Sequence, residues 1–458
     1  MKKIDLNPYL DSINEYAEIR VQENKDEKIS IVNGNIMKNT SVLKSGVSAR
    51  VYKKSKWGFC SLPEITPQAI SKVIKQADEN ADFLSKKEKS EINLDKLSGE
   101  YYNDFSFKEN HKTQKEKINF LQELENYLNK TYPELSAVTI VLNNLSMEKQ
   151  YANTHNASNY SFIPRSNLYL TLSITNDNIP TDIIKVYGGF GNFEDNFQSI
   201  ESLKPEIEEQ YKHLVNKTKA VFAQSGEKEC ILDSHLAGIL AHESIGHLAE
   251  ADFVSSASIL RDRVGKQIAS EMFSLTDFAH HYKDTLCHVP VFMDDEGTPA
   301  SDVRIIENGI LKNFMHSKES AHKFNVKATG NARAFDYSDD PIIRMRNTAI
   351  LPGNNKLDEM ISSIDDGYYF INYSNGEADD TSEFMFGVTL GYEIKKGKLG
   401  KAVKDTTISG VALNTLKTIS MISDGMKWNC TGFCGKMQMI PVSFGGPAVK
   451  CRINVGGR

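Results

Sequence analysis

The sequence predicts an α+β protein of two domains, with the boundary near residue 226. Residues 1–226 place antiparallel strands and helices in separate runs, without the strand–helix alternation of a parallel sheet. Residues 227–458 contain one apolar helix, after which short apolar segments are joined by Gly and Asn turns. This pattern predicts a β-rich C-terminal domain that carries a single buried helix.

The first strands follow a short helix that we expect over residues 5–16. Four segments then alternate or run apolar, as the strands of an antiparallel group do: AEIRVQE, EKISIVNGNI, SVLKSGVSARVYK and WGFCSL. Asn33-Gly34 is a strong turn signal within this group. We therefore expect an antiparallel sheet that ends near residue 62.

A helix follows, because Thr66 is a favourable cap and Pro67 stands at the first helical position. The apolar residues after Pro67 recur at helical spacing. The other N-terminal elements are a charged irregular connection, a second helix, a strand group and a long charged helix, expected over residues 85–110, 112–131, 136–187 and 199–223.

The predicted C-terminal domain opens with a short strand, ECILD, and a helix that begins at Ser234. Later segments have the composition of strands: HVPVFMDD, DVRIIENGILKNFM, EFMFGVTLGYEIKKGKLGKAV and MIPVSF. We therefore expect antiparallel strands through most of the region after residue 285.

Charge and hydropathy exclude several classes of protein. The net charge of -6 argues against a nucleic-acid binder, which usually has a basic balance. The N-terminal residues lack an apolar stretch of signal-peptide length, and no run approaches the roughly 18 apolar residues of a spanning helix. We expect a cytoplasmic protein without a membrane partner, in which the six cysteines do not form a disulfide framework.

The segment HESIGH places two histidines, His242 and His247, around Glu243. On a regular helix, residues five apart point about 140° away from each other, so they do not converge on one ion. A π-bulge brings the fifth residue round to the same face. If HESIGH is a metal site rather than a chance cluster, we expect such a distortion within residues 243–247, where Gly246 relaxes the backbone.

A zinc site needs a third protein ligand. Spacing alone leaves several candidates for this ligand: Glu250, Asp252, His280, His281, His288, Cys430 and Cys434. Cys434 stands before Gly435 in NCTGFCGKMQMIPV, where a tight turn could present the thiol to a metal. The alternative for each cysteine is a small buried apolar residue.

Four ordered motifs resemble the TldD branch of the TldD/PmbA (TldE) family of metallopeptidases. They are HESIGHLAEADF, MDDEGTPASDV, ATGNARAFDYSDDPIIRMRNTAILPG and GFCGKMQMIPVSFGGPAVKCRINVGG. The third motif departs from the family pattern, because Ala332 and Ala334 stand where Gly and Arg are usual. The fourth departs at KMQMIPVSFGG, so the peptide preference of the family does not transfer directly.

The resemblance implies one zinc ion held by His242, His247 and Cys434. It also implies a chamber that admits unfolded peptides, formed by a homodimer or by a heterodimer with a PmbA/TldE-like subunit. The alternatives are a non-catalytic, peptide-binding partner subunit and a zinc hydrolase of non-peptide amides. The natural substrate, its cleavage position and the choice between the two dimers are left open.

Roles follow for the residues around the ion. Glu243 is the expected general base, and Glu250 is the expected acceptor for the second ring nitrogen of His247. Arg333, Arg344 and Asn347 are candidates to grip the peptide, with salt bridging and turn stabilisation as the alternative. For Cys430 and Cys451 we expect a packing role.

Overall fold

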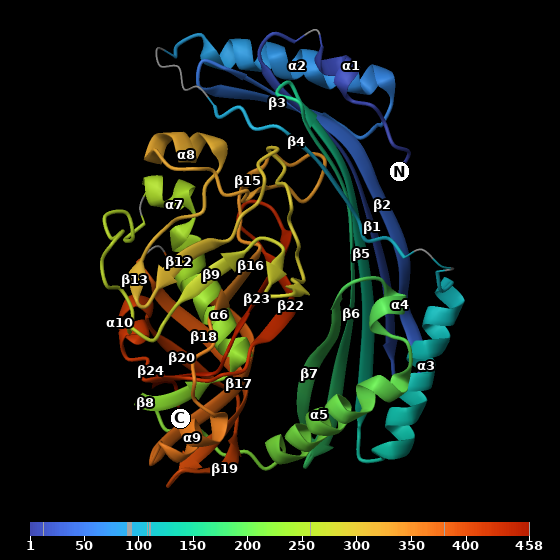
Figure 1. Ribbon diagram of the computed structural model, residues 1–458. Helices are drawn as coiled ribbons and strands as arrows, with labels where there is room; N and C mark the ends of the chain where they lie inside the picture. The colour runs from blue at the N-terminus through green and yellow to red at the C-terminus, as the bar shows by residue number, and fades with distance from the viewer. Residues whose placement is uncertain are drawn as a thin grey trace.

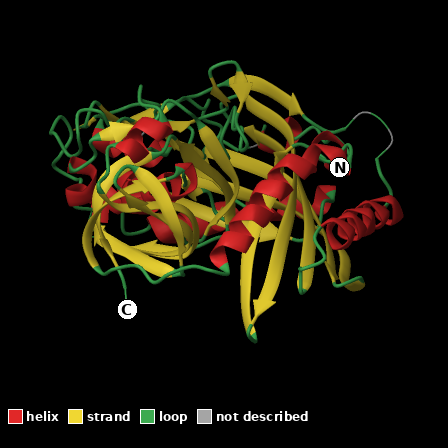
Figure 2. Ribbon diagram, turned by 90° about the horizontal axis from the view of Figure 1, so that it is seen from below, coloured by secondary structure: helices red, strands yellow, loops and turns green. Residues whose placement is uncertain are grey.

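The computed structural model describes most of the chain. The described residues are 1–11, 13–88, 94–107, 109, 111–256, 258–379 and 381–457. They form an α+β protein with a long curved sheet on one side and a β-rich C-terminal part on the other (Figure 1). Seen from below, strands make up most of both parts and helices lie against them (Figure 2).

The N-terminal sheet confirms the expected antiparallel group. Its order is β3-β2-β1-β5-β6-β4, with β7 also paired to β6. The strands are β1 (Tyr16–Val32), β2 (Asn35–Lys53), β3 (Lys56–Leu62), β4 (Gly99–Asp104), β5 (Ala137–Asn153), β6 (Ala157–Asn176) and β7 (Ile179–Phe190). Asn33 and Gly34 have φ of 46° and 82° in the β1–β2 turn, which is the conformation that favours this pair.

The two faces of this sheet contact different parts of the chain. On β1, Ile19 and Val21 belong to the hydrophobic core that α2 closes. Arg20 and Gln22 point to the other face and donate to the carbonyl oxygens of Asp336 and Phe335 in the C-terminal part. Alternation along a strand therefore gives one face to helices and the other to the C-terminal part.

The helices that cover the N-terminal sheet include two that begin where the sequence predicts. They are α2 (Pro67–Ser85), which Thr66 caps, and α3 (Gln114–Thr131), which begins with a capping box at Thr113. The remaining N-terminal helices are α1 (Asn7–Leu10), α4 (Phe193–Asn196), η1 (Ile200–Leu203) and α5 (Lys204–Lys217).

Three predictions of local structure are wrong in extent. The helix expected over 5–16 is limited to α1, because from Tyr16 onward the chain forms β1 and pairs with β2 and β5. Residue 12 lies outside the described residues. The helix expected over 199–223 ends at Lys217. The connection at 85–110 contains β4, which pairs in parallel with β6; its residues 89–93, 108 and 110 are outside the described residues.

The C-terminal part contains two larger sheets and two short strand pairs. One sheet has the order β13-β12-β9-β16-β23-β22 and the other the order β17-β8-β24-β20-β18-β19, with β21 on β24; the pairs are β10–β11 and β14–β15. The strands are β8 (Gly226–Leu232), β9 (Leu275–Phe278), β10 (His281–Tyr282), β11 (Thr285–Leu286), β12 (Val303–Glu307), β13 (Ile310–Leu311), β14 (Ala332–Arg333), β15 (Ile342–Ile343), β16 (Asn347–Ile350), β17 (Asp366–Ala378), β18 (Glu383–Lys395), β19 (Lys398–Val403), β20 (Thr406–Val411), β21 (Met421–Ile422), β22 (Lys427–Cys434), β23 (Ile440–Gly446) and β24 (Val449–Val455).

Helix α6 (Ser234–Ala241) lies between these two sheets, against β16, β22 and β23 of the first and β17 of the second. The other helices here are short: α7 (Ala251–Ser256), α8 (Lys318–Phe324), α9 (Leu357–Ser362) and α10 (Ala412–Lys417). The strand expected in HVPVFMDD is wrong, because residues 288–295 form a loop with one isolated bridge, Met293 to Pro299.

A buried ionic network joins the N-terminal sheet to the C-terminal part. Nη2 of Arg50 lies 2.7 Å from Oε2 of Glu18 and 3.0 Å from Oε1 of Glu296. Nζ of Lys318 donates to the hydroxyl of Tyr16 at 2.5 Å. The division of the chain at residue 226 into two independent domains stays a prediction. Among the described residues, no helix is long and apolar enough to cross a membrane.

Candidate metal centre

Helix α6 carries the HESIGH segment into the interior. The Asp233 carboxylate caps the helix by accepting hydrogen bonds from the backbone N–H groups of His235 and Leu236, at 3.0 and 3.1 Å. Seven of its eight residues are buried. Because α6 packs between two sheets, the residues that follow Ala241 are held in the core of the C-terminal part.

The predicted distortion is present. Residues His242–Gly246 form one π-helical turn (η2), in which the backbone N–H of His247 donates to the carbonyl of His242. A 3-10 turn (η3), His247–Ala249, follows. Gly246 leaves space for the side chain of Met345, because a Cβ at this position would lie 2.1 Å from Sδ of Met345 and would force that side chain to move. The extra residue of the π turn therefore brings the two histidines together.

Cys434 completes a set of three possible ligands. The ligand atoms of His242, His247 and Cys434 all lie within 4.8 Å of one another, and Sγ of Cys434 is 3.2 Å from Nε2 of His247. Cys434 is the last residue of β22. Among the described residues, no other group of three His, Cys, Asp or Glu residues meets this criterion. Of the alternatives that spacing left open, Cys434 is the one that groups with both histidines within the described part of the chain; its role as a ligand stays a prediction.

The chemistry of these three side chains fits zinc. Burial raises the pKa of the Cys434 thiol, but hydrogen bonds from His242 and His247 outweigh burial and lower it to about 4. The thiolate form binds metal ions. Nδ1 of His242 is buried and has no hydrogen-bond partner among the described residues, although the ring itself is hydrogen-bonded to Cys434. A His2Cys set matches the ligands zinc prefers.

A second layer of charged residues surrounds His247. Oε2 of Glu250 lies 3.1 Å from Nδ1 of His247 and 2.9 Å from Nζ of Lys436. Lys436 also approaches Oδ2 of Asp252, at 2.5 Å. Burial raises the pKa of Glu250, but the neighbouring His247 and Lys436 charges produce a net lowering. No role for Lys436 was predicted, although it stands only two residues after Cys434.

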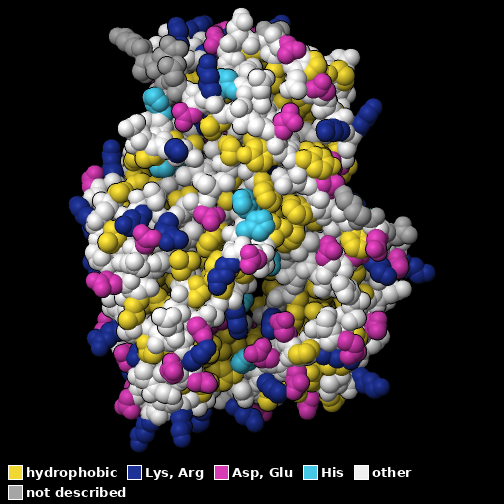
Figure 3. Space-filling model, viewed as in Figure 1, with side chains coloured by type: hydrophobic (Ala, Val, Ile, Leu, Met, Phe, Trp, Pro, Cys, Tyr) yellow, Lys and Arg dark blue, Asp and Glu magenta, His cyan; other side chains and the backbone are white. Residues whose placement is uncertain are grey.

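Glu243 faces the ligand set from within the π turn. Its Oε2 lies 3.7 Å from Nε2 of His247, and its side chain is 25% exposed, whereas that of Glu250 is 0% exposed. The Glu243 carboxylate is therefore partly open to solvent, whereas that of Glu250 is enclosed. On the face drawn in Figure 3, histidine side chains gather near the middle of the molecule.

The three candidate peptide-binding residues are buried and bonded to backbone. Arg344 donates to the carbonyls of Cys434, Lys436 and Gln438. The Asn347 amide donates to the carbonyls of residues 278 and 289, and Arg333 donates to those of residues 345 and 441. The structure gives each an internal role, which is hydrogen bonding to backbone rather than salt bridging. Contact with a peptide stays a prediction.

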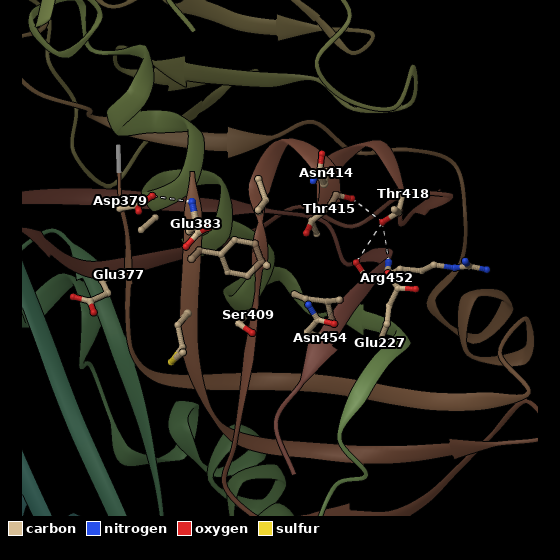
Figure 4. A pocket seen from close by; sticks show the side chains of 16 residues that line it. Glu227, Glu377, Asp379, Glu383, Ser409, Asn414, Thr415, Thr418, Arg452 and Asn454 are labelled. Carbon is tan, nitrogen blue, oxygen red and sulfur yellow. Dashed lines mark hydrogen bonds between the residues drawn. The ribbon is translucent and has the colours of Figure 1, made fainter. Parts of the chain in front are cut away.

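Two other cysteines of the C-terminal region lie apart from the three possible ligands. Cys430 donates to the carbonyl of Gly188 at 2.9 Å, and Cys451 is buried in the core. The large pocket in Figure 4 shares no residue with the metal centre. Its acidic side chains, Glu227, Glu377, Asp379 and Glu383, lie along the sheet formed by β8, β17 and β18. Pocket size alone therefore does not mark the reactive site.

Comparison with known families gives two matches. Residues 225–457 match the PmbA/TldA metallopeptidase C-terminal domain, and residues 17–81 match the PmbA/TldA metallopeptidase domain 1. The first match covers the part that carries the three possible ligands, and the second covers strands β1 to β3 of the N-terminal sheet.

Individual proteins are similar over different lengths. A zinc metalloprotease TldD homolog of Saccharolobus solfataricus is 29% identical over 90% of each chain. A metalloprotease TldD homolog of Buchnera aphidicola is 41% identical over 51% of this chain and 49% of its own. The crystal structure of TldE from Thermococcus kodakarensis has the same fold, with a TM-score of 0.78 at 18% identity over 99% of this chain and 98% of that one.

Proposed function

Because this chain belongs to the PmbA/TldD family of metallopeptidases, we propose that it hydrolyses peptides with one zinc ion bound by His242, His247 and Cys434. The observation that carries the proposal is the convergence of these three side chains across a π turn. Names of similar proteins, which include zinc metalloprotease, support the same reaction class.

The residues around the ligand set have separate roles. A zinc ion held by three protein ligands supplies Lewis acidity and makes a nearby water more acidic. Glu243 accepts the proton of the attacking water and delivers it to the leaving amine. Glu250 holds the ring of His247 in one orientation, and Lys436 neutralises the buried Glu250 carboxylate. Hydrolysis thus relies on one carboxylate to move the proton and another to fix a ligand.

We infer that the substrate is a small or unfolded peptide and that it reaches Glu243 inside an enclosed chamber. Such a chamber requires a second subunit, either a copy of this chain or a PmbA/TldE-like chain. Similarity to the TldE fold supports this kind of assembly. The cleavage position follows from neither the ligand set nor the fold.

The test is the metal content of the purified protein, measured by elemental mass spectrometry. We expect about one zinc per chain in the wild type and loss of the ion in Cys434→Ala. Cys430→Ala is the matched control, because Cys430 lies on the same strand and bonds to a backbone carbonyl instead. A folded wild-type chain that takes up no zinc would favour the non-catalytic partner subunit. Equal zinc in both variants would contradict the role of Cys434.

A further inference from the structure

A small cavity with a positively charged wall lies between the N-terminal sheet and the C-terminal part. Its volume is about 70 Å³, and strands β4, β5 and β6 line one side. The loop over residues 289–295, together with Arg333 and Pro441, lines the other. Its apolar wall includes Phe292 and Met293. The cavity shares no residue with the metal ligands, and the proposed function gives it no role.

Arg165 on β6 is the most unusual group in this cavity. Only 4% of the residue is exposed, and its Nη2 donates to the carbonyl of Cys430. Nε and Nη1 have no hydrogen-bond partner among the described residues. Burial lowers the pKa of this guanidinium, in keeping with a charge removed from water. A buried cation with free donors is costly unless a ligand supplies the opposite charge.

The charges around Arg165 do not neutralise it. Nζ of Lys149 pairs with Asp295 at 2.7 Å. Arg333 is 6% exposed and donates only to backbone carbonyls. Asp294 accepts hydrogen bonds from backbone N–H groups, which occupy its carboxylate. With both aspartates ionised, three cations face two carboxylates, so the cavity carries an excess of positive charge.

The cavity is coupled to the metal centre through β22. Arg165 binds the carbonyl of Cys430 in this strand, and its guanidinium carbon is 5.9 Å from the centre of the Phe433 ring. The next residue along is Cys434. Strand β22, the edge strand of its sheet, therefore carries both a residue that contacts Arg165 and the possible ligand Cys434.

We propose that Arg165, with Arg333 beside it, binds a carboxylate of the peptide substrate. The cavity has room for a carboxylate and a few further atoms, and its apolar wall suits the carbon atoms that a carboxylate is attached to. Charge-assisted hydrogen bonds from a desolvated guanidinium are strong, which gives such a pocket its selectivity. The proposal rests on the proposed function, because it assigns the ligand as a peptide. The carboxylate is either the C-terminus of the peptide or the side chain of an Asp or Glu residue.

The experiment measures binding without hydrolysis. The protein is the zinc-loaded Glu243→Gln variant, and the probes are peptides with an N-terminal fluorophore, followed by fluorescence anisotropy. One pair differs only in a free C-terminal carboxylate or a C-terminal amide. A second pair, amidated at the C-terminus, differs only in an internal Glu or Gln. We expect one pair to differ in Kd by roughly tenfold or more, and that pair identifies the source of the carboxylate.

Adding Arg165→Gln to the Glu243→Gln protein should abolish the difference in Kd within that peptide pair. Adding Arg304→Gln instead should preserve it. Arg304 is a surface arginine, half exposed, which makes it a matched control. Thermal unfolding of Arg165→Gln separates binding from folding: removing an uncompensated buried charge leaves Tm unchanged or raises it, whereas loss of a structural arginine lowers it.

Two outcomes overturn the proposal. One is an equal Kd within both peptide pairs, and the other is a carboxylate preference that survives Arg165→Gln. The proposed function fails separately. A wild-type protein that shows the carboxylate preference but hydrolyses no peptide supports the pocket and contradicts the peptidase. Hydrolysis with no carboxylate preference does the reverse.

Discussion

The buried carboxylate of Glu250 pairs with the partly exposed ring of His247, and its oxygen Oε2 lies 3.1 Å from the ring nitrogen Nδ1. The pair fixes which ring nitrogen of His247 faces Cys434, because Nε2 is the atom 3.2 Å from Sγ. Glu250 also binds Lys436, which follows Cys434 by two residues. The Glu250 carboxylate thus orients His247, a possible ligand on η3. Through Lys436 it also holds the loop that follows Cys434, a possible ligand at the end of β22.

Substitution of Glu250 tests this orienting role. We expect Glu250→Gln to weaken zinc binding roughly 10- to 100-fold, as removal of an outer hydrogen-bond partner commonly does. Competition against a chelator of known affinity measures the effect. Asp252→Asn is the control, since Asp252 also contacts Lys436 but does not contact His247. Unchanged affinity in Glu250→Gln would show that the His247 ring is held by other means.

Glu243→Gln tests the general base. The amide cannot accept the proton, so we expect kcat/KM to fall by about 10²- to 10⁴-fold. The zinc content should stay at the wild-type level. Peptide hydrolysis and elemental analysis of the same preparation provide both readings. Glu227→Gln, a change in the distant pocket of Figure 4, should leave activity unaltered. Full activity in Glu243→Gln would exclude the assignment.

Gly246→Ala tests the packing that permits the π turn. The added Cβ would lie 2.1 Å from Sδ of Met345, and we expect a loss of about 1–3 kcal/mol in the free energy of unfolding together with weaker metal binding. In a Met345→Ala background the same change should cost less, because the clashing atom is gone. Gly425→Ala is the control, since nothing lies within 4 Å of its added Cβ. Equal costs in both backgrounds would locate the strain elsewhere.

Arg344→Lys distinguishes support of the Cys434 loop from contact with substrate. Arg344 is fully buried and spans three backbone carbonyls, which a single ammonium cannot do. We expect roughly tenfold weaker zinc binding, with KM for peptide unchanged once zinc is saturating. Arg452→Lys, far from this loop, serves as the control. A raised KM with normal zinc affinity would instead assign Arg344 to the peptide.

The lowered pKa of Glu27 predicts that the contact between β1 and α3 loses stability in acid. Burial raises its pKa, but hydrogen bonds from Lys117 and Lys25 outweigh this and lower it to about 2. Because the pKa in the folded protein lies below the ordinary glutamate value of 4.5, the stabilisation is complete above about pH 4.5 and is lost as the pH falls toward 2. Allowing for partial exposure, we expect a loss of about 1 kcal/mol.

Urea unfolding at about pH 5 and about pH 3, compared between wild type and Glu27→Gln, measures this contribution. The wild type should lose more stability than the variant over this interval, since the variant lacks the titrating group. Parallel losses in the two proteins would mean that the Glu27–Lys117 contact, which joins β1 to α3, contributes nothing in solution.

Local signals in the sequence predicted local structure well. The Asn33–Gly34 turn, the Thr66 cap and the π turn at 242–246 are all present. Each depends on a few neighbouring residues: a pair that tolerates positive φ, a hydroxyl that accepts a backbone N–H, and a five-residue spacing that only a π turn reconciles with one face. Such patterns act over one turn of chain, so one sequence suffices to read them.

Predictions failed where distant partners decide the local structure. The chain at Tyr16 becomes strand because β2 and β5 pair with it, and β4 forms within a charged connection because β6 accepts it. The apolar loop 288–295 has the composition of a strand but packs against the N-terminal sheet instead. Periodicity carries no information about which distant segment will supply the hydrogen bonds.

The sequence alone predicts the α+β class, the buried helix that carries HESIGH and a distortion of the chain between His242 and His247. It could not choose the third ligand from spacing, and only the family resemblance pointed to Cys434. The tertiary structure brings Sγ of Cys434 to 3.2 Å from Nε2 of His247, a histidine 187 residues away. It also places Glu250 and Lys436 together and leaves two nitrogens of Arg165 without a hydrogen-bond partner among the described residues. These relationships depend on the packing of sheets against one helix, and local spacing does not encode that packing.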